Sequence, residues 1–274
     1  MQAQGERWSE LAPAKINLAL HVRGRLPDGR HALETLFAFC TEGDRLWGEP
    51  ADAFNLEVTG PFAGALGEEE DNLVLRAARA LADRAGTGRG AALTLRKSLP
   101  VASGIGGGSA DAAAALRLLT AMWGIDPAHA SEVAPHLGAD VPACLVSMTC
   151  RGSGVGDRLE LADDVGVAGA PVLLVNSRVP LSTREVFARW GGVDGGPLTS
   201  DWRDARNDLE RPARELVPQI GEVLDWLAAQ DGVALARMSG SGATCFALFH
   251  SEQALDAAAG ACPAAWWHLA TALR

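Results

Sequence analysis

The sequence contains no tyrosine, and lysine occurs only twice among its 24 basic residues, as Lys15 and Lys97. Because arginine stands at every other basic position, each lysine indicates a site that favours a compact ammonium over a planar guanidinium. No apolar run reaches the roughly 18–20 residues of a membrane-spanning helix. The first ten residues are polar and lack the basic-then-apolar order of a secretory signal. These absences predict a cytoplasmic protein without a membrane partner.

Cysteine is scarce, and none of the five cysteines forms a CxxC pair. This pattern favours buried free thiols in a reducing compartment over the alternatives of zinc ligands or disulfides. Acidic residues outnumber basic ones by 34 to 24, for a formal net charge of −10. That balance argues against a nucleic-acid partner and leaves room for a local pocket that binds a phosphorylated small molecule.

With 274 residues, of which 48% are hydrophobic, the chain is long enough for two modest domains. Hydrophobic periodicity predicts strands at residues 16–22, 54–58, 91–95, 171–175, 233–237, 244–249 and 266–271. It predicts helices at residues 112–123, 127–137, 183–190, 210–230 and 252–259, and one that ends near Ala85 with Asp71 or Asn72 as its N-cap. Because helices and strands mix without strict alternation, we expect an α+β fold. The expected domains are 1–160 and 161–274.

The strongest functional pattern is LPVASGIGGGSADA, from Leu99 to Ala112. Glycines let a backbone approach an anion closely, and the helix that follows offers free N–H groups and the positive end of its dipole. No lysine follows the glycines as a Walker A loop requires, and Ser109 replaces the last glycine of a dinucleotide fingerprint. A phosphate-binding loop is therefore the better interpretation, and a purely structural glycine turn is the alternative.

Two charged residues lie in apolar surroundings. Lys15 occurs in PAKIN and Asp140 in LGADVP. Read separately, Lys15 is a surface lysine and Asp140 a helix N-cap. Read together, they form a candidate acid–base pair, because an ammonium keeps a nearby carboxylate ionised for proton transfer. A second glycine turn, RMSGSGATCF from Arg237 to Phe246, is either a tight hairpin or a segment that closes over a ligand.

These four motifs together resemble the GHMP kinase superfamily. Further segments resemble one branch of it, kinases of a cytidine diphosphate ester of methylerythritol: residues 24–31, 35–37, 43–44, 71–73, 154–157 and 207–210. The resemblance implies a two-domain GHMP kinase fold, with a ribosomal-protein-S5-like N-terminal domain and a ferredoxin-like C-terminal domain. It implies phosphorylation of the substrate's 2-hydroxyl by ATP with Mg²⁺, in the supply of isoprenoid precursors. The implied partner is the small cytidine diphosphate substrate, and no nucleic-acid partner is implied. The implied oligomeric state is a monomer or a homodimer.

The resemblance also assigns roles to residues. It implies that Lys15 and Asp140 are catalytic, with Asp140 accepting the hydroxyl proton. The implied ATP-binding residues are Asn72, Leu73, Lys97, Pro100, Ser103, Gly104, Gly106, Gly107, Gly108 and Ser109. Ser109 is the implied Mg²⁺ contact. The implied substrate-binding residues are Asn17, Arg30, His31 and Phe187, with His31 at the cytosine edge.

One position departs from the family pattern. Arg30 stands where the family usually has a tyrosine that stacks on the cytosine. A guanidinium plane can also stack on a base; in the alternative, Arg30 turns outward and Phe187 stacks alone. The eight tryptophans are interpreted as packing residues. Other readings of the chain are a GHMP kinase of homoserine, mevalonate or a sugar, and a binding module that has kept the fold without catalysis.

Overall fold

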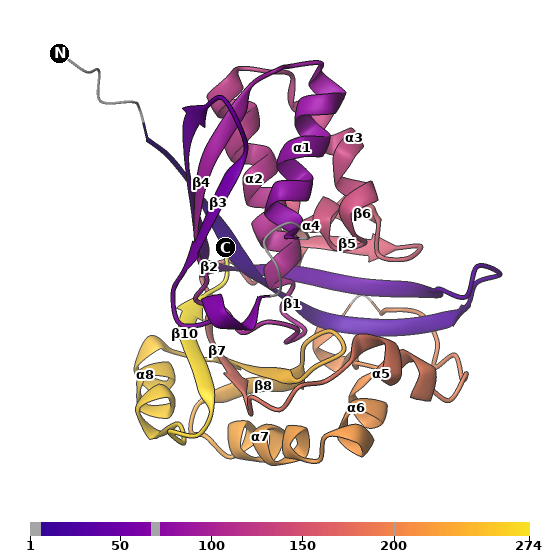
Figure 1. Ribbon diagram of the computed structural model, residues 1–274. Helices are drawn as coiled ribbons and strands as arrows, with labels where there is room; N and C mark the ends of the chain where they lie inside the picture. The colour runs from indigo at the N-terminus through magenta and orange to yellow at the C-terminus, as the bar shows by residue number, and fades with distance from the viewer. Residues whose placement is uncertain (1–6, 67–71, 200) are drawn as a thin grey trace. The chain divides into compact units, whose positions relative to one another are not determined.

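The computed structural model describes residues 7–66, 72–199 and 201–274 (Figure 1). Contacts divide the chain into two compact units. Unit 1 comprises Met1–Ala14, Glu42–Val101 and Gly106–Ser147, and unit 2 comprises Lys15–Thr41, Ala102–Ile105 and Met148–Arg274. The units are interleaved in sequence because two long strands pass through both of them. A division into consecutive domains at residue 160 stays a prediction.

The long strands are β1 (Trp8–Arg25) and β2 (His31–Ala51), which pair with each other. Hydrophobic periodicity predicts only residues 16–22 of β1 and assigns no strand to the residues of β2. Both strands are much longer than this pattern indicates. In β1 every residue from Ala12 to Val22 is buried. A strand buried on both faces loses the alternation of polar and apolar residues that marks its length.

In unit 1, β4 (Gly90–Arg96) pairs antiparallel with the second half of β2 and parallel with β3 (Asn55–Thr59). Four helices accompany these strands: α1 (Leu73–Ala85), α2 (Gly107–Trp123), α3 (Pro127–Leu137) and α4 (Val141–Val146). α2 packs against the other three, and its buried face consists largely of alanines that allow a close approach. The expected helices in this region are confirmed.

The ends of α1 follow from local chemistry. The Asn72 side-chain oxygen accepts the Val74 N–H at 2.9 Å, and Gly86 closes the helix in the left-handed region with φ of 61°. Asn72 is thus the N-cap, one of the two residues predicted for that role. The other, Asp71, lies outside the described residues.

In unit 2, β5 (Cys150–Ser153) and β6 (Arg158–Leu161) form a hairpin that continues the sheet from the first half of β2. The sequence pattern predicts neither strand, because four-residue strands with glycine or charged side chains show no clear apolar alternation. Gly152 explains the close approach to β2: a Cβ there would lie 2.7 Å from the Phe37 ring. Only glycine fits at this point of the pairing.

Unit 2 also contains an antiparallel sheet in the order β10-β7-β9-β8. Its strands are β7 (Pro171–Asn176), β8 (Val233–Met238), β9 (Thr244–Phe249) and β10 (Trp267–Ala272). Helices α7 (Gln219–Ala228) and α8 (Glu252–Ala261) pack against this sheet (Figure 1). All six residues of β9 are buried. These strands and α8 were expected from the sequence and are confirmed.

Two shorter helices complete unit 2, α5 (Thr183–Arg189) and α6 (Glu210–Leu216). The single helix expected over residues 210–230 is wrong, because the chain forms α6 and α7 with a break at Val217 and Pro218. Val217 leaves the helical region with φ of −132° and ψ of 88°. A proline disfavours helical geometry in the residue before it, and its ring supplies no N–H for an α-helical bond.

The five cysteines are free thiols, and four of them are buried. Burial raises the pKa of the Cys40 thiol to about 12. The expectation of buried free thiols is confirmed for these four, whereas Cys262 is half-buried. In the part of the chain that the structure describes, no helix is both long and apolar enough to cross a membrane.

Candidate active site

Lys15 lies in the interior of unit 2, with 3% of its surface exposed. Its ammonium donates to the Asn17 side-chain oxygen at 2.9 Å and stands 5.2 Å from the centre of the Phe37 ring. The Asn17 amide in turn donates to the Thr35 hydroxyl at 2.7 Å. The alternative of a surface lysine is therefore wrong. A buried ammonium held by an amide and a ring is a positioned positive charge in a medium of low dielectric.

Three of the predicted motifs meet around this lysine within unit 2. The Lys15 N–H donates to the Ile105 carbonyl at 3.0 Å. The Ser239 hydroxyl accepts the Asn17 N–H at 3.1 Å and donates to the Gly104 carbonyl at 3.0 Å. Gly104 has φ of 77°, and a Cβ there would lie 2.6 Å from the Ser239 carbonyl oxygen. Glycine at this position lets the lysine motif, the phosphate loop and the second glycine turn approach one another.

Asn207 binds the backbone of the second glycine turn. Its side-chain amide donates to the carbonyls of Met238 and Gly240, both at 2.8 Å, and its oxygen accepts the Leu209 N–H at 2.9 Å. A buried amide with these bonds fixes the backbone around it. The segment that starts at Asn207 therefore holds the turn against which Lys15 and Asn17 are placed.

The other half of the glycine loop lies in unit 1. Gly106, with φ of 65°, is the N-cap of α2, and Gly107, Gly108 and Ser109 form its first turn. The N–H groups of a first turn have no acceptor within their own helix. Leu73 borders this turn, because a Cβ added at Gly108 would lie 3.4 Å from the Leu73 side chain. Two predicted parts of the ATP site, the loop and Leu73, are thus neighbours.

Lys97 is buried beside the first turn of α2, with 1% of its surface exposed. Its ammonium donates to the Asp111 carboxylate at 2.7 Å and to the Asp44 carboxylate. The second oxygen of Asp44 accepts the Leu99 N–H at 2.8 Å. The Lys97 nitrogen is 3.0 Å from the point where a Cβ of Gly107 would be. The structure thus directs the ammonium toward two carboxylates, and its contact with ATP stays a prediction.

The three buried groups carry two negative charges and one positive charge when all are ionised. Burial raises the pKa of Asp111 to about 7, Lys97 opposes that rise, and the neighbouring Asp44 adds to it. Burial alone would lower the pKa of Lys97, but the two carboxylates outweigh it and raise this pKa. One oxygen of Asp111 is buried without a hydrogen-bond partner among the described residues. These groups join the end of β4 to the first turns of α2.

Asp140 occupies the N-cap position of α4 and is half-buried, but its side chain makes no capping bond. The helix-cap interpretation thus agrees with the position of Asp140 at the start of α4, but its carboxylate does not act as the cap. Asp140 belongs to unit 1 and Lys15 to unit 2, and their pairing stays a prediction.

The remaining predicted ATP and metal contacts are also placed. Pro100 is buried, and the carbonyl of the buried Ser103 accepts the Thr244 N–H at 3.1 Å. Across residues 7–66, 72–199 and 201–274, no group of three or more His, Cys, Asp or Glu side chains could hold a metal ion. Ser109, half-buried in the first turn of α2, stays the predicted Mg²⁺ contact.

The predicted base-recognition residues form an aromatic cluster in unit 2. The His31 ring lies 4.8 Å from Phe187 with an interplanar angle of 30°, and 5.6 Å from Trp190 at 86°. His31 Nε2 is buried without a hydrogen-bond partner among the described residues. Burial, with a smaller effect of Arg25, lowers the pKa of His31. The imidazole is thus favoured in its neutral form, with one donor and one acceptor nitrogen.

Arg30 is exposed and pairs with Asp28, its Nε donating at 2.8 Å, so its guanidinium is turned to the Asp28 side of the turn. Its contact with substrate stays a prediction. Trp190 packs against the hydrophobic core, as the interpretation of the tryptophans as packing residues predicts, and it also contacts the His31 ring. Its spacing of three from Phe187 is consistent with this shared contact, since residues three apart share one helix face.

Comparisons with known proteins agree with this arrangement of motifs. Residues 72–148 match the family model of the GHMP kinases N terminal domain, and residues 198–267 match that of the GHMP kinases C terminal. The chain is 54% identical to a 4-diphosphocytidyl-2-C-methyl-D-erythritol kinase of Rhizorhabdus wittichii, over 98% of both chains. It is 52% identical to the protein of that name from Novosphingobium aromaticivorans, over 97% of this chain and 92% of that one.

A solved structure has the same fold. The crystal structure of a 4-(cytidine 5'-diphospho)-2C-methyl-D-erythritol kinase matches 97% of this chain and 98% of its own, with a TM-score of 0.84 and 33% identity. This coverage extends over both units of the chain.

Proposed function

The chain belongs to the GHMP kinase family, and we propose that it phosphorylates the 2-hydroxyl of 4-diphosphocytidyl-2-C-methyl-D-erythritol with ATP, giving the 2-phosphate and ADP. The observation that carries this proposal is the 54% identity to a kinase of that name over 98% of both chains. In this function the protein supplies an intermediate of the non-mevalonate route to isoprenoid precursors.

In the proposed reaction, Asp140 accepts the proton of the substrate hydroxyl. The hydroxyl oxygen forms a bond to the γ-phosphorus of ATP, and the bond from that phosphorus to the β–γ bridging oxygen breaks, so that ADP leaves. Lys15 stabilises the negative charge that develops, and burial supports this role because a positioned charge acts more strongly where water is excluded. Most of the rate in phosphoryl transfer comes from such positioning and charge stabilisation.

The first turn of α2 suits the phosphates of ATP. The N–H groups of a first turn have no acceptor within their helix, and with the positive end of the helix dipole they favour an anion. Leu73, beside Gly108, offers an apolar surface to the nucleoside. The Ser109 hydroxyl is an oxygen ligand of the kind Mg²⁺ prefers. When bound, Mg²⁺ neutralises part of the phosphate charge.

The test measures ATP consumption with 4-diphosphocytidyl-2-C-methyl-D-erythritol, mevalonate or homoserine as acceptor. We expect turnover with the cytidine substrate alone, and Asp140→Asn should lower kcat by about 10²–10⁴-fold while ATP still binds. Asp126→Asn is a matched control, because Asp126 is also a helix N-cap aspartate and asparagine caps equally well.

Each contrary result has a defined meaning. Turnover with mevalonate or homoserine would keep the kinase class and discard the cytidine substrate. ATP binding with no turnover on any of these acceptors would favour a non-catalytic binding module. An Asp140→Asn enzyme as active as Asp126→Asn would remove Asp140 from the proposed mechanism.

A further inference from the structure

Trp190 is the third ring of the aromatic cluster in unit 2, directly after α5. Its plane is nearly perpendicular to that of His31, whereas Phe187 lies close to parallel with His31. All three rings are half-buried, so each keeps some surface for a ligand. A base that bonds edge-to-edge with an imidazole lies near the plane of that ring. The plane of such a base would be close to parallel with Phe187, which allows stacking, and nearly perpendicular to Trp190, which allows an edge-to-face contact. Both are favourable aromatic geometries.

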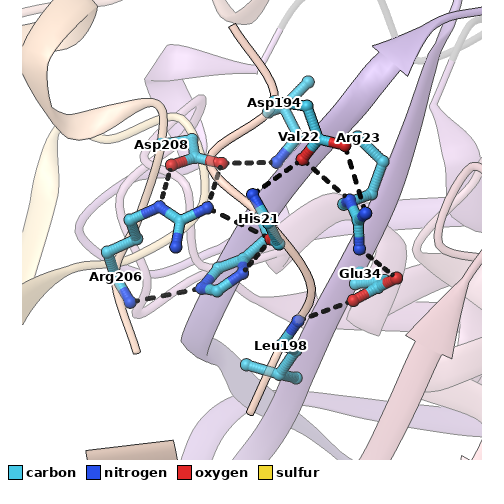
Figure 2. Close-up of polar contacts among 9 residues, drawn as sticks. His21, Val22, Arg23, Glu34, Asp194, Leu198, Arg206 and Asp208 are labelled. Atoms are coloured by element: carbon cyan, nitrogen blue, oxygen red, sulfur yellow. Dashed lines mark hydrogen bonds and ion pairs between the residues drawn. The ribbon is translucent and has the colours of Figure 1, made fainter. Parts of the chain in front are cut away.

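Hydrogen bonds from charged side chains hold the chain after Trp190 in place. Gly191 and Gly192 follow Trp190 directly, and consecutive glycines give the backbone wide freedom. Four residues after the tryptophan, the Asp194 carboxylate receives two parallel hydrogen bonds from Arg23, at 3.0 and 3.1 Å (Figure 2). A two-bond fork between guanidinium and carboxylate fixes orientation as well as distance.

The same arginine connects this loop to the strand that carries His31. Arg23 donates through Nη1 to Glu34 at 2.6 Å, and the other Glu34 oxygen accepts the Leu198 N–H at 2.7 Å (Figure 2). Glu34 stands three residues after His31 on β2. Residues 194–198 are thereby fixed to the strand of His31.

We propose that Trp190 is a specificity-determining residue that contacts the cytosine ring of the substrate, and that Arg23, Glu34 and Asp194 position it against His31. This inference rests on the proposed function, which supplies the cytosine. The guanidinium of Arg30, next to His31 in sequence, is paired with Asp28. Trp190 therefore provides the aromatic surface that position 30 lacks.

The experiment compares KM for the cytidine substrate and KM for ATP in the wild type and in Trp190→Ala, Trp190→Leu and Trp190→Phe. Removing one aromatic partner of a base should raise KM for the cytidine substrate by about tenfold or more, with KM for ATP unchanged. Trp190→Leu keeps apolar volume without a ring and should behave like alanine, whereas Trp190→Phe should keep most of the affinity.

Trp226→Phe is the matched control, because Trp226 makes a similar T-shaped contact with Trp266, at 5.7 Å, away from His31. It should leave both KM values unchanged. A folded Trp190→Leu with wild-type KM for the cytidine substrate would overturn the inference. So would a variant that raises both KM values equally, since that indicates general damage.

The positioning role has its own readout. Asp194→Asn should raise KM for the cytidine substrate in the wild type but add nothing in the Trp190→Ala background, because the fork acts through the tryptophan. Equal effects in both backgrounds would overturn this role. If the wild type turns over the cytidine substrate and the Trp190 variants have wild-type KM values, this inference is contradicted and the proposed function is not. A wild type without such turnover would overturn the proposed function and the inference with it.

Discussion

Two charge networks of similar composition serve the two units in different ways. Around Lys97 in unit 1, the ammonium and its two carboxylate partners are 4% exposed or less. Around Arg23 in unit 2, the three charged side chains are between 26% and 41% exposed. Burial makes the first network strongly coupled and costly to break, whereas solvent screens the second. The buried network joins the end of β4 to the first turns of α2, and the exposed one joins residues 194–198 to β1 and β2.

The variant Lys97→Met should lose the most stability. It leaves two buried carboxylates without their cation, and loss of one partner of a buried pair destabilises a protein by about 3–5 kcal/mol. Urea denaturation measures the change. Adding Asp111→Asn to Lys97→Met should restore part of the loss, because it removes one of the uncompensated charges. A change near zero for Lys97→Met would show that the buried network is no more important for stability than an exposed pair.

The second prediction concerns pH. Because burial raises the pKa of Asp111 to about 7, from its ordinary value of 3.8, the folded state binds a proton more tightly than the unfolded one. The contribution of Asp111 to stability is therefore fully present below pH 3.8 and is lost as pH rises toward 7. Denaturation midpoints across this window should fall less steeply in Asp111→Asn than in the wild type. Parallel curves would contradict the raised pKa.

The third prediction concerns the exposed network. Arg23→Met should change the denaturation midpoint far less than Lys97→Met and should raise KM for the cytidine substrate. High salt should reproduce part of the KM effect in the wild type, because about 1 M salt shortens the screening length to about 3 Å. The stability contributed by Lys97 should be much less sensitive to salt. Equal sensitivity of the two networks would remove the distinction between them.

The smallest expected effect is at His21, beside the exposed network. Its Nδ1–H donates to the Gly196 carbonyl at 3.1 Å, and its Nε2 accepts the Arg206 N–H at 3.4 Å (Figure 2). Burial and Arg206 lower its pKa, so stability is fully present above pH 6.5 and falls as pH drops through the folded-state pKa. His21→Asn should flatten this acid limb of the denaturation midpoint. The direction is opposite to that at Asp111.

Local signals in the sequence predicted the elements whose causes are local. The Asn72 cap, the glycine after α1 and the glycine–serine start of α2 need only their near neighbours, and the structure has them as expected. Pro218 is also a local signal, for a helix break, and the prediction of one helix over residues 210–230 did not take it into account. β5 and β6 have no such local signal, because β5 is a strand only by pairing with β2, and β6 only by pairing with β5.

The chemical groups of this protein can be read directly from its residues: the glycine loop, the two rare lysines, the acid at position 140 and the order of motifs that marks the family. The partners of these groups follow from the packing of the folded chain. That packing placed Lys97 between Asp111 and Asp44, which is 53 residues away, and Asp194 against Arg23, 171 residues away. The physical reason is that such contacts depend on how long strands and helices pack, and hydrophobic burial drives that packing without recording in the local sequence which distant side chains will meet.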